Sequence, residues 1–287
     1  MLISEECKKC MMRQKINAYP KDADQKDITI YQREVREIID HCDGLSTPQI
    51  AEKIYALRSD LFGEALDYAT IKSRFNHLML SMLPYMRQQV TEAEDPLKMA
   101  VQYAMAGNYI DFGVLSNVNE TELRKQLDEA VHTTIEPEML ESFRTEMLRA
   151  RHLVYFTDNC GEIVADKLLI SVLREMNPNL TVTVIVRGLP AINDATLEDA
   201  AQIGMGEAAS RVIGNGAGMP GNVIGAISEE AMDEISRADV LIAKGQGNYE
   251  GLSGCGLNIF YFFLCKCELF MRRFKVPQFT GIMTRER

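Results

Sequence analysis

Residues 152–186 read HLVYFTDNCGEIVADKLLISVLREMNPNLTVTVIV, and this stretch decides the fold class of the chain. The apolar run His152–Phe156 is rich in residues typical of strands and ends in a polar turn. Apolar residues at helical spacing follow from position 163 to 176, and Asn177-Pro178-Asn179 then interrupts the pattern. A second strand-like run covers residues 180–186. The stretch therefore predicts two parallel strands joined by a helix.

The alternation of strands and helices continues to the end of the sequence. Further strand-like runs occupy residues 211–213 and 239–243, and the aromatic run Ile259–Leu264 has the composition of a buried strand. Ser228 is suited to cap a helix that precedes the second of these runs. Apolar strands that alternate with amphipathic helices are typical of a mostly parallel sheet. We therefore expect residues 151–287 to form an α/β domain in which helices flank a mostly parallel sheet.

Residues 1–150 have a different character, because strand-like runs are absent and apolar residues fall at helical spacing. Ile28, Tyr31 and Val35, for example, lie on one apolar stripe. This half is predicted to be an all-helical cap domain. Its expected helices cover residues 47–56, 67–85 and 138–149, the first with Thr47 as N-cap and Pro48 at the first helical position.

The composition argues against several classes of function. The chain has 287 residues, a formal net charge of -10 and a pI near 5.1, which disfavours nucleic acid or an anionic membrane as its main partner. No apolar run approaches the roughly 20 residues that a membrane-spanning helix needs. Residues 1–20 lack the apolar core of a signal peptide, and the seven cysteines fit reduced thiols better than a disulfide framework. We therefore expect a cytoplasmic protein, and we find no signal for its oligomeric state.

Polar residues follow the first two predicted strands at their carboxyl ends, where open α/β sheets bind ligands. Asp158 and Asn159 come directly after the first strand, and Asp194 lies in the loop after the second. Each of these residues has a simpler interpretation as a helix N-cap, which for Asp158 and Asn159 alone is equally good. Neighbouring parallel strands would bring the two loops together, however, and carboxylate and amide oxygens are ligands that Mg²⁺ and Mn²⁺ prefer. The pattern therefore predicts a divalent-metal site.

Two cations also lie at strand ends. Arg187 ends the second strand and is either a phosphate contact or a salt-bridge partner of a nearby carboxylate. Lys244 ends a later strand and is followed by Gly245 and Gly247, so a point charge would lie beside exposed backbone N–H groups. This is not a Walker A loop, because the lysine precedes the glycines. The arrangement suits a phosphate group.

Three of these segments together resemble the damage-control phosphatase family, formerly known as domain of unknown function 89. They are TDNCGE at 157–162, RGLPAINDAT at 187–196 and AKGQGNYEGL at 243–252. The resemblance extends to CKKC at 7–10, DYATIKSRFN at 67–76 and AGNYIDFG at 106–113, so it covers most of the chain in the expected order. The N-terminal Cys-x-x-Cys is similar to that of the mainly prokaryotic branch.

The resemblance implies a metal-dependent phosphatase that acts on small phosphorylated metabolites, such as sugar phosphates or damaged phospho-cofactors. We expect Mg²⁺ or Mn²⁺ as the cofactor, with Co²⁺ or Ni²⁺ as alternatives. Water is favoured over Asp158 as the nucleophile, because a metal ligand that also attacks must keep one oxygen free. By position in the motifs, the implied metal ligands are Asp158, Asn159 and Asp194, and the implied phosphate ligand is Lys244. Glu162 and Asn193 would lie in or beside the site. Asn108 and Asp111 would close over the substrate from the helical half.

Two other features support rival functions. The glycine-rich residues 214–221 (GNGAGMPG) are superficially similar to a dinucleotide-binding loop and would suit a nucleotide- or S-adenosylmethionine-binding transferase. Cys7 and Cys10 have zinc-ligand spacing, but a structural site needs two more ligands, and His41-Cys42 is the only nearby pair. The two cysteines are therefore either helix thiols or part of a structural metal site. The latter would allow a non-enzymatic module that binds a metal or a phosphorylated ligand.

Overall fold

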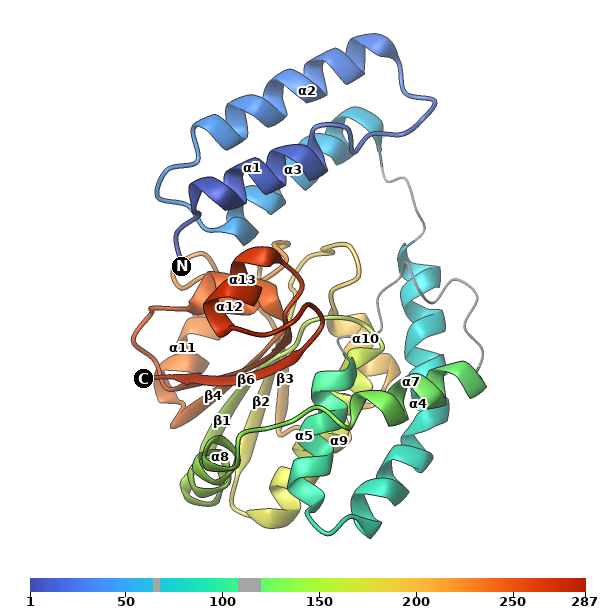
Figure 1. Cartoon of the computed structure of the whole chain (residues 1–287), viewed down its shortest axis with the longest axis vertical. Helices are drawn as coiled ribbons and strands as arrows, with labels where there is room; N and C mark the ends of the chain where they lie inside the picture. Colours follow the sequence, from blue (N-terminus) through green and yellow to red (C-terminus); the bar gives the residue numbers. More distant parts are fainter. Residues whose placement is uncertain (64–67, 108–119) are drawn as a thin grey trace.

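A computed structural model describes residues 1–63, 68–107 and 120–287, so the predicted site residues Asn108 and Asp111 lie outside the described part. A six-stranded sheet occupies the C-terminal half, with strand order β3-β2-β1-β4-β5-β6 (Figure 1). All neighbours pair in parallel except β5 and β6, which are antiparallel. The predicted fold class, a mostly parallel sheet flanked by helices after an all-helical N-terminal half, is confirmed. The strands are β1 (His152–Phe156), β2 (Thr181–Val186), β3 (Arg211–Gly214), β4 (Val240–Lys244), β5 (Ile259–Leu264) and β6 (Gly281–Glu286).

The order of the strands places a ligand crevice at β1. The chain runs from β1 to β2 and β3 on one side and then crosses back to β4 on the other side. The loops that follow β1 and β4 therefore diverge, which is where open α/β sheets bind ligands. Phe156 pairs with Ile185 on β2 and with Ala243 on β4. Two residues further on, Asp158 leaves the sheet between the segments that carry Arg187 and Gly245.

Helices cover both faces of the sheet because successive strand residues point to opposite sides. Leu153 and Tyr155 of β1 belong to one apolar cluster, and Val154 and Phe156 belong to another. On the first face lie α4 (Tyr68–Glu92), α5 (Pro96–Ala106), α7 (Glu120–Ala130), α8 (Pro137–Arg149), α9 (Glu162–Met176), α10 (Leu197–Gln202) and the 3₁₀ turn η2 (Met205–Glu207). On the second lie α11 (Glu229–Arg237), α12 (Gln246–Leu252) and α13 (Glu268–Phe274).

The first three helices form a separate layer above the sheet (Figure 1). They are α1 (Glu5–Lys15), α2 (Gln25–Asp40) and α3 (Thr47–Phe62), and they pack around their own cluster, which includes Tyr31 and Val35. Helices α4 to α8 instead share one continuous core with α9 and the sheet. Residue 150 thus marks the change in secondary structure, whereas the boundary in packing lies between α3 and α4.

The ends of two predicted helices differ from the expectation. Ser46, not Thr47, is the N-cap of α3, because its backbone N–H bonds the Gln49 side chain at 3.0 Å in a capping box. Helix α4 continues to Glu92, beyond the predicted end at residue 85 and through Pro84. Within the described ranges, no helix has both the length and the apolar character needed to cross a membrane.

Asp239 ties the start of β4 to the start of β1. Its Oδ2 accepts the backbone N–H groups of Arg151 (2.7 Å) and His152 (3.0 Å), and these bonds lower the pKa of the carboxyl. Because the folded-state pKa lies below the unfolded value, the stabilisation is present above pH 4 or so and is lost as the pH falls through the folded pKa. Asp239→Asn should lower the free energy of unfolding by up to about 1 kcal/mol at pH 7. Calorimetric melts should show that the difference from wild type shrinks as the pH falls below about 4; a difference that does not change with pH would contradict this account.

Candidate active site

The loops after β1 and β2 form one backbone structure at the carboxyl edge of the sheet. Asn159 and Asp194 form an isolated antiparallel bridge. The Cys160 N–H bonds the Asn193 carbonyl at 2.8 Å, and the Ala195 N–H bonds the Asp158 carbonyl at 2.8 Å. The structure thus brings together the three residues that we predicted as metal ligands. The main chain, as well as the side chains, sets their relative positions.

The side chain of Asn159 is hydrogen-bonded to three other predicted site residues. Its Nδ2 donates to Asp158 Oδ2 and to Glu162 Oε2, both at 2.8 Å. Its Oδ1 accepts a hydrogen bond from Asn193 Nδ2 at 2.7 Å. The amide therefore presents its NH₂ group, not its oxygen, to the carboxylates. Ligation of a metal through Asn159 Oδ1 would require this amide to rotate by about half a turn.

Arg187 lies beneath the same edge and is almost completely buried. Its Nε donates to Asp194 Oδ2 at 2.6 Å, which is the salt-bridge interpretation of this residue. Its Nη2 lies 3.6 Å from Asp158 Oδ1, too far for a hydrogen bond, and has no hydrogen-bond partner among the described residues. A buried N–H group without a hydrogen-bond partner lowers the stability of the protein. The Nη2 group of Arg187 is therefore a donor with unused hydrogen-bonding capacity, and it is directed toward the carboxylates. The salt-bridge interpretation of Arg187 thus agrees with the structure, and the phosphate contact stays a prediction.

Burial, and then the crowding of carboxylates, raises the pKa values at this edge. Burial, and then the charges of Asp194 and Glu162, raise the pKa of Asp158 to about 7. Burial also raises the pKa of Asp194, against the opposing effect of Arg187. Ionised carboxylates that lie close together destabilise one another unless a cation balances them.

Lys244 lies below the crevice, enclosed by protein groups. Its ammonium donates to the Ala104 carbonyl at 2.6 Å, to Glu162 Oε1 at 2.7 Å and to Asp166 Oδ1 at 2.5 Å, and its side chain has no exposed surface. Burial disfavours the charge, but Asp166 and Glu162 outweigh it and raise the pKa of Lys244 to about 12. All three N–H groups are therefore engaged, and none is directed at the place where we predicted a phosphate.

Gly245 allows the Asp158 carboxylate to lie directly against the β4 strand end. A Cβ atom at this position would lie 2.0 Å from Asp158 Oδ2, and the backbone φ of 81° also favours glycine. The predicted role of Gly245 was to expose backbone N–H groups. In the structure its own N–H bonds the Phe262 carbonyl at 2.9 Å. Its role is therefore to provide space for Asp158.

Gly245→Ala should therefore displace the Asp158 carboxylate and lower the kcat of the phosphatase reaction that the family resemblance implies by about 10²-fold, since a shift of about 1 Å at a reacting centre costs that much. Gly254→Ala is the matched control, because Gly254 has a φ of 83° but no atom within 4 Å of an added Cβ. Both variants place an alanine at a positive φ, but only Gly245→Ala brings a Cβ against Asp158. Steady-state kinetics on the two variants therefore separate the effect of the steric clash from that of backbone strain. Equal activity of the two variants would show that the space at Gly245 is unimportant.

Several residues of the site escaped the sequence analysis. Asp166 lies one turn after Glu162 on α9 and accepts hydrogen bonds from Lys244 and from the Tyr155 hydroxyl, the latter at 2.7 Å. Asn248 lies in α12, four residues after Lys244, and donates to the Lys244 carbonyl at 2.7 Å and to the Thr157 carbonyl at 3.0 Å. A usable signal exists for Asp166, because a polar residue four positions after a site residue on the same helix lies on the same face. Asn248 has no such signal, since Lys244 belongs to strand β4.

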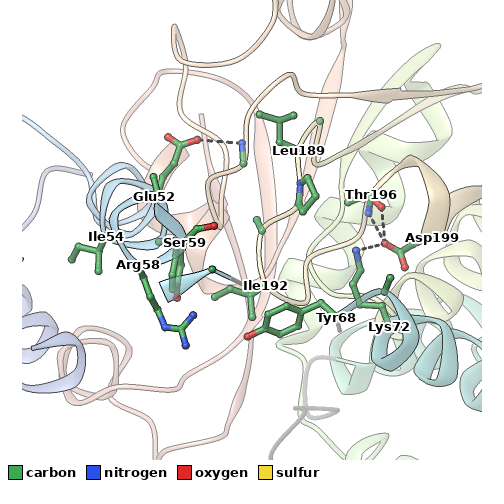
Figure 2. A pocket seen from close by; sticks show the side chains of 18 of the residues that line it. Glu52, Ile54, Arg58, Ser59, Tyr68, Lys72, Leu189, Ile192, Thr196 and Asp199 are labelled. Carbon is green, nitrogen blue, oxygen red and sulfur yellow. Dashed lines mark hydrogen bonds and ion pairs between the residues drawn. The ribbon is translucent and has the colours of Figure 1, made fainter. Parts of the chain in front are cut away.

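A cavity of about 1090 Å³ lies beside the β2–α10 loop. Side chains of α3 line one side and the first turns of α4 line the other, with Leu189 and Ile192 of the loop between them (Figure 2). Asp158 and Asn159 are not in its wall, but Ile192 is two residues from Asp194. Ile192 has a φ of 51°, a conformation that costs a β-branched residue roughly 1–3 kcal/mol. The loop thus holds a strained residue between the cavity and the carboxylates.

The rival sites lack the geometry that they need. Residues 214–221 lead into no helix until α11 begins at Glu229, so the strand–turn–helix of a dinucleotide fingerprint is absent there. The loop instead packs against the β2 loop, where a Cβ on Gly188 would lie 2.2 Å from the Gly216 nitrogen. Cys7 and Cys10 are free thiols, and in the parts of the chain that the structure describes no three His, Cys, Asp or Glu side chains are grouped so that they could hold a metal ion.

Comparison with known proteins identifies the family. The model of the damage-control phosphatase ARMT1-like domain matches residues 3–281. This chain belongs to the damage-control phosphatase family. A relative from Archaeoglobus fulgidus named damage-control phosphatase is 34% identical over 221 residues, which cover 76% of this chain and 75% of that protein. Damage-control phosphatase PH1575 of Pyrococcus horikoshii is 38% identical over 184 residues, or 63% of this chain and 62% of that one.

The three-dimensional comparison agrees with this assignment. A crystal structure of a DUF89 family protein from P. horikoshii superposes on all of this chain and all of its own, with a TM-score of 0.83 and 26% sequence identity. The family that the motifs predicted is therefore confirmed. The match covers the α1–α3 layer as well as the sheet, so the whole chain has the architecture of a damage-control phosphatase.

Proposed function

We propose that this protein is a metal-dependent phosphatase that hydrolyses phosphate esters of small phosphorylated metabolites. Membership of the damage-control phosphatase family and the names of its relatives support the reaction type. One observation carries the metal dependence: the buried site has two more carboxylates than cations. The carboxylates are those of Asp158, Glu162, Asp166 and Asp194, and the cations are Arg187 and Lys244.

The donor set and the charge both fit a divalent cation. A charge of +2 would balance the excess of two carboxylates and remove the repulsion that raises the pKa of Asp158. Asp158 and Asp194 would hold the ion through carboxylate oxygens, and Asn159 would contribute Oδ1 after rotation of its amide. Mg²⁺ or Mn²⁺ prefers such ligands, and Co²⁺ or Ni²⁺ could substitute. When bound, the metal supplies positive charge that stabilises the charge developing on a phosphoryl group.

The two cations take different roles in this proposal. Arg187 Nη2 is buried, has no hydrogen-bond partner among the residues described and is directed at Asp158, so it is suited to bind a phosphoryl oxygen. Lys244 donates a hydrogen bond to Glu162, and Glu162 in turn accepts a hydrogen bond from the Asn159 side chain. Lys244 is therefore proposed to position the Asp158–Asn159 loop. We transfer the predicted phosphate contact of Lys244 to Arg187.

The cavity beside the β2–α10 loop is the proposed place for the organic part of the substrate. Its volume is in the upper range of small-molecule pockets. Arg58 and Lys72 are cations in its wall, Glu52 and Asp199 are carboxylates, and Tyr68 and Ser59 contribute hydroxyl groups (Figure 2). Such a polar wall suits a polar metabolite better than an apolar one.

A phosphate-release assay tests this function. Purified protein would be freed of metal with EDTA, supplied separately with Mg²⁺, Mn²⁺, Co²⁺ or Ni²⁺, and presented with sugar phosphates and phosphorylated cofactors. We expect turnover of some of these esters only when metal is present, with loss of activity on renewed chelation. Full turnover in EDTA, or no turnover of any ester with any metal, would contradict the proposal.

A further inference from the structure

The side chain of Asn76 on α4 contacts both the turn that precedes the helix after β1 and the helix after β2. It has no exposed surface. Its Oδ1 accepts the backbone N–H of Gly161 at 2.7 Å. Its Nδ2 donates to Asp199 Oδ1 and to Gln202 Oε1, both at 2.8 Å. Gly161 belongs to the turn before α9, whereas Asp199 and Gln202 belong to α10, so one amide joins three elements.

The contact at Gly161 fixes the turn that carries Asp158 and Asn159. Gly161 is the N-cap of α9 and has a φ of 72°, and its N–H has no place in the helix ladder. Asn76 supplies the acceptor that this buried N–H needs. A Cβ on Gly161 would lie 3.5 Å from Phe75 and Met79, so α4 packs directly against the turn. The position of the turn therefore depends on α4.

The contact of Asn76 with Asp199 fixes the β2–α10 loop, which carries Asp194. Asp199 Oδ2 accepts hydrogen bonds from the backbone N–H of Thr196 at 2.8 Å and from the Thr196 hydroxyl at 2.9 Å. These bonds cap the start of α10, two residues after Asp194. The same oxygen pairs with Lys72 at 2.5 Å. Lys72 and Asn76 lie one turn apart on one face of α4, and Lys72 also lines the cavity. One face of α4 thus borders the cavity and contacts both loops.

We propose that Asn76 is a positioning residue that sets the separation of Asp158 and Asp194. The inference rests on the proposed phosphatase function, in which these two carboxylates act together. An amide is required at this position because it accepts from Gly161 and donates to Asp199 at the same time. Alanine leaves a buried donor and a buried acceptor without partners, and aspartate places a second carboxylate against Asp199.

Asn76→Ala, compared with Met86→Ala, tests the proposal. Met86 is completely buried on the same helix, far along it from both loops, so its truncation lowers global stability without touching them. We expect Asn76→Ala to lower kcat by about 10²-fold while KM changes by less than about threefold. Met86→Ala should keep kcat within about twofold of wild type at a temperature where it is folded.

Hydrogen exchange followed by mass spectrometry gives a readout that does not depend on activity. Peptides that cover residues 157–165 and 194–202 should exchange at least about tenfold faster in Asn76→Ala than in Met86→Ala under conditions of equal global stability. Equal exchange in the two variants, or an Asn76→Ala kcat within about threefold of the Met86→Ala value, would overturn the proposal. If the wild type hydrolyses no phosphate ester, the proposed function fails and the exchange rates alone decide whether Asn76 positions the loops.

An exchange of the two side chains provides a rescue test. In the double variant Asn76→Asp with Asp199→Asn, an amide again faces a carboxylate, and Lys72 keeps an ion-pair partner one turn away. We expect Asn76→Asp alone to be the least active variant. The kcat of the double variant should be at least about tenfold higher than that of Asn76→Asp. A double variant as inactive as Asn76→Asp would overturn the proposal.

Discussion

Asp158→Asn should lower the rate of phosphate release by on the order of 10³-fold at saturating metal and substrate, because it removes a charged ligand that would hold and orient the metal, whose positive charge stabilises the developing phosphoryl charge. The amide retains the size of the carboxylate and can still accept from Asn159. The fold should therefore survive. Phosphate release from the best ester found for the wild type is the measurement. Full metal-dependent turnover by this variant would show that the site is assigned to the wrong residues.

The same substitution should make the metal-free protein more stable. Burial and two neighbouring carboxylates raise the pKa of Asp158 from its ordinary value of 3.8 to about 7, so the folded state binds more protons than the unfolded state between these values. Stability of the metal-free wild type therefore falls as the pH rises through this window. Asp158→Asn removes that fall, and its Tm in EDTA should exceed the wild-type value at pH 7.5 and approach it near pH 4. Asp60→Asn, which changes an exposed carboxylate on α3, should leave both activity and Tm unchanged.

Lys244→Met should lower the free energy of unfolding by about 3–5 kcal/mol, because Glu162 and Asp166 would remain buried without their common cation. Activity should fall with it, since Glu162 would no longer be held beside Asn159. Urea unfolding and steady-state kinetics measure the two effects. We expect Lys244→Met to lower kcat by a larger factor than it lowers the affinity for inorganic phosphate, which is measured from product inhibition.

Lys167→Met is the matched control for this experiment. Lys167 is also buried, but its carboxylate partner Glu207 reaches solvent, so its loss leaves no buried charge. It should therefore cost less stability than the loss of Lys244, mainly through the lost hydrogen bond to the Ile203 carbonyl at 2.9 Å. A normally stable Lys244→Met protein with a large loss of phosphate inhibition would contradict our account. That result would return Lys244 to its original prediction as a direct phosphate ligand.

The sequence predicted those parts of the fold and the site that depend on local patterns. The first two strands and the helix between them follow from apolar runs and breaks at Asn177-Pro178-Asn179, and parallel pairing then places Asp158 beside Asp194. The antiparallel strand β6 was not predicted, because Gly281–Glu286 has no continuous apolar run and gains its strand conformation from pairing with β5.

The direction of buried charged side chains could not be predicted in the same way. Lys244 leaves its strand at the correct end, but only the packing of α9 against the sheet places Glu162 and Asp166 around its ammonium. Asn76 lies in a motif that we noted, yet its role depends on contacts with Gly161 and Asp199, more than 80 and 120 residues away. Helix periodicity also could not separate the α1–α3 layer from the helices that cover the sheet, because both have one apolar face.

Equilibrium dialysis of Mn²⁺ against the wild type and Asp158→Asn tests the central claim most directly, because it measures the metal site without any substrate. We predict one bound ion per wild-type chain and at least about 100-fold weaker binding to Asp158→Asn, since the variant loses one of the two charged ligands proposed here. Equal Mn²⁺ binding by the two proteins would place the metal elsewhere and contradict the account.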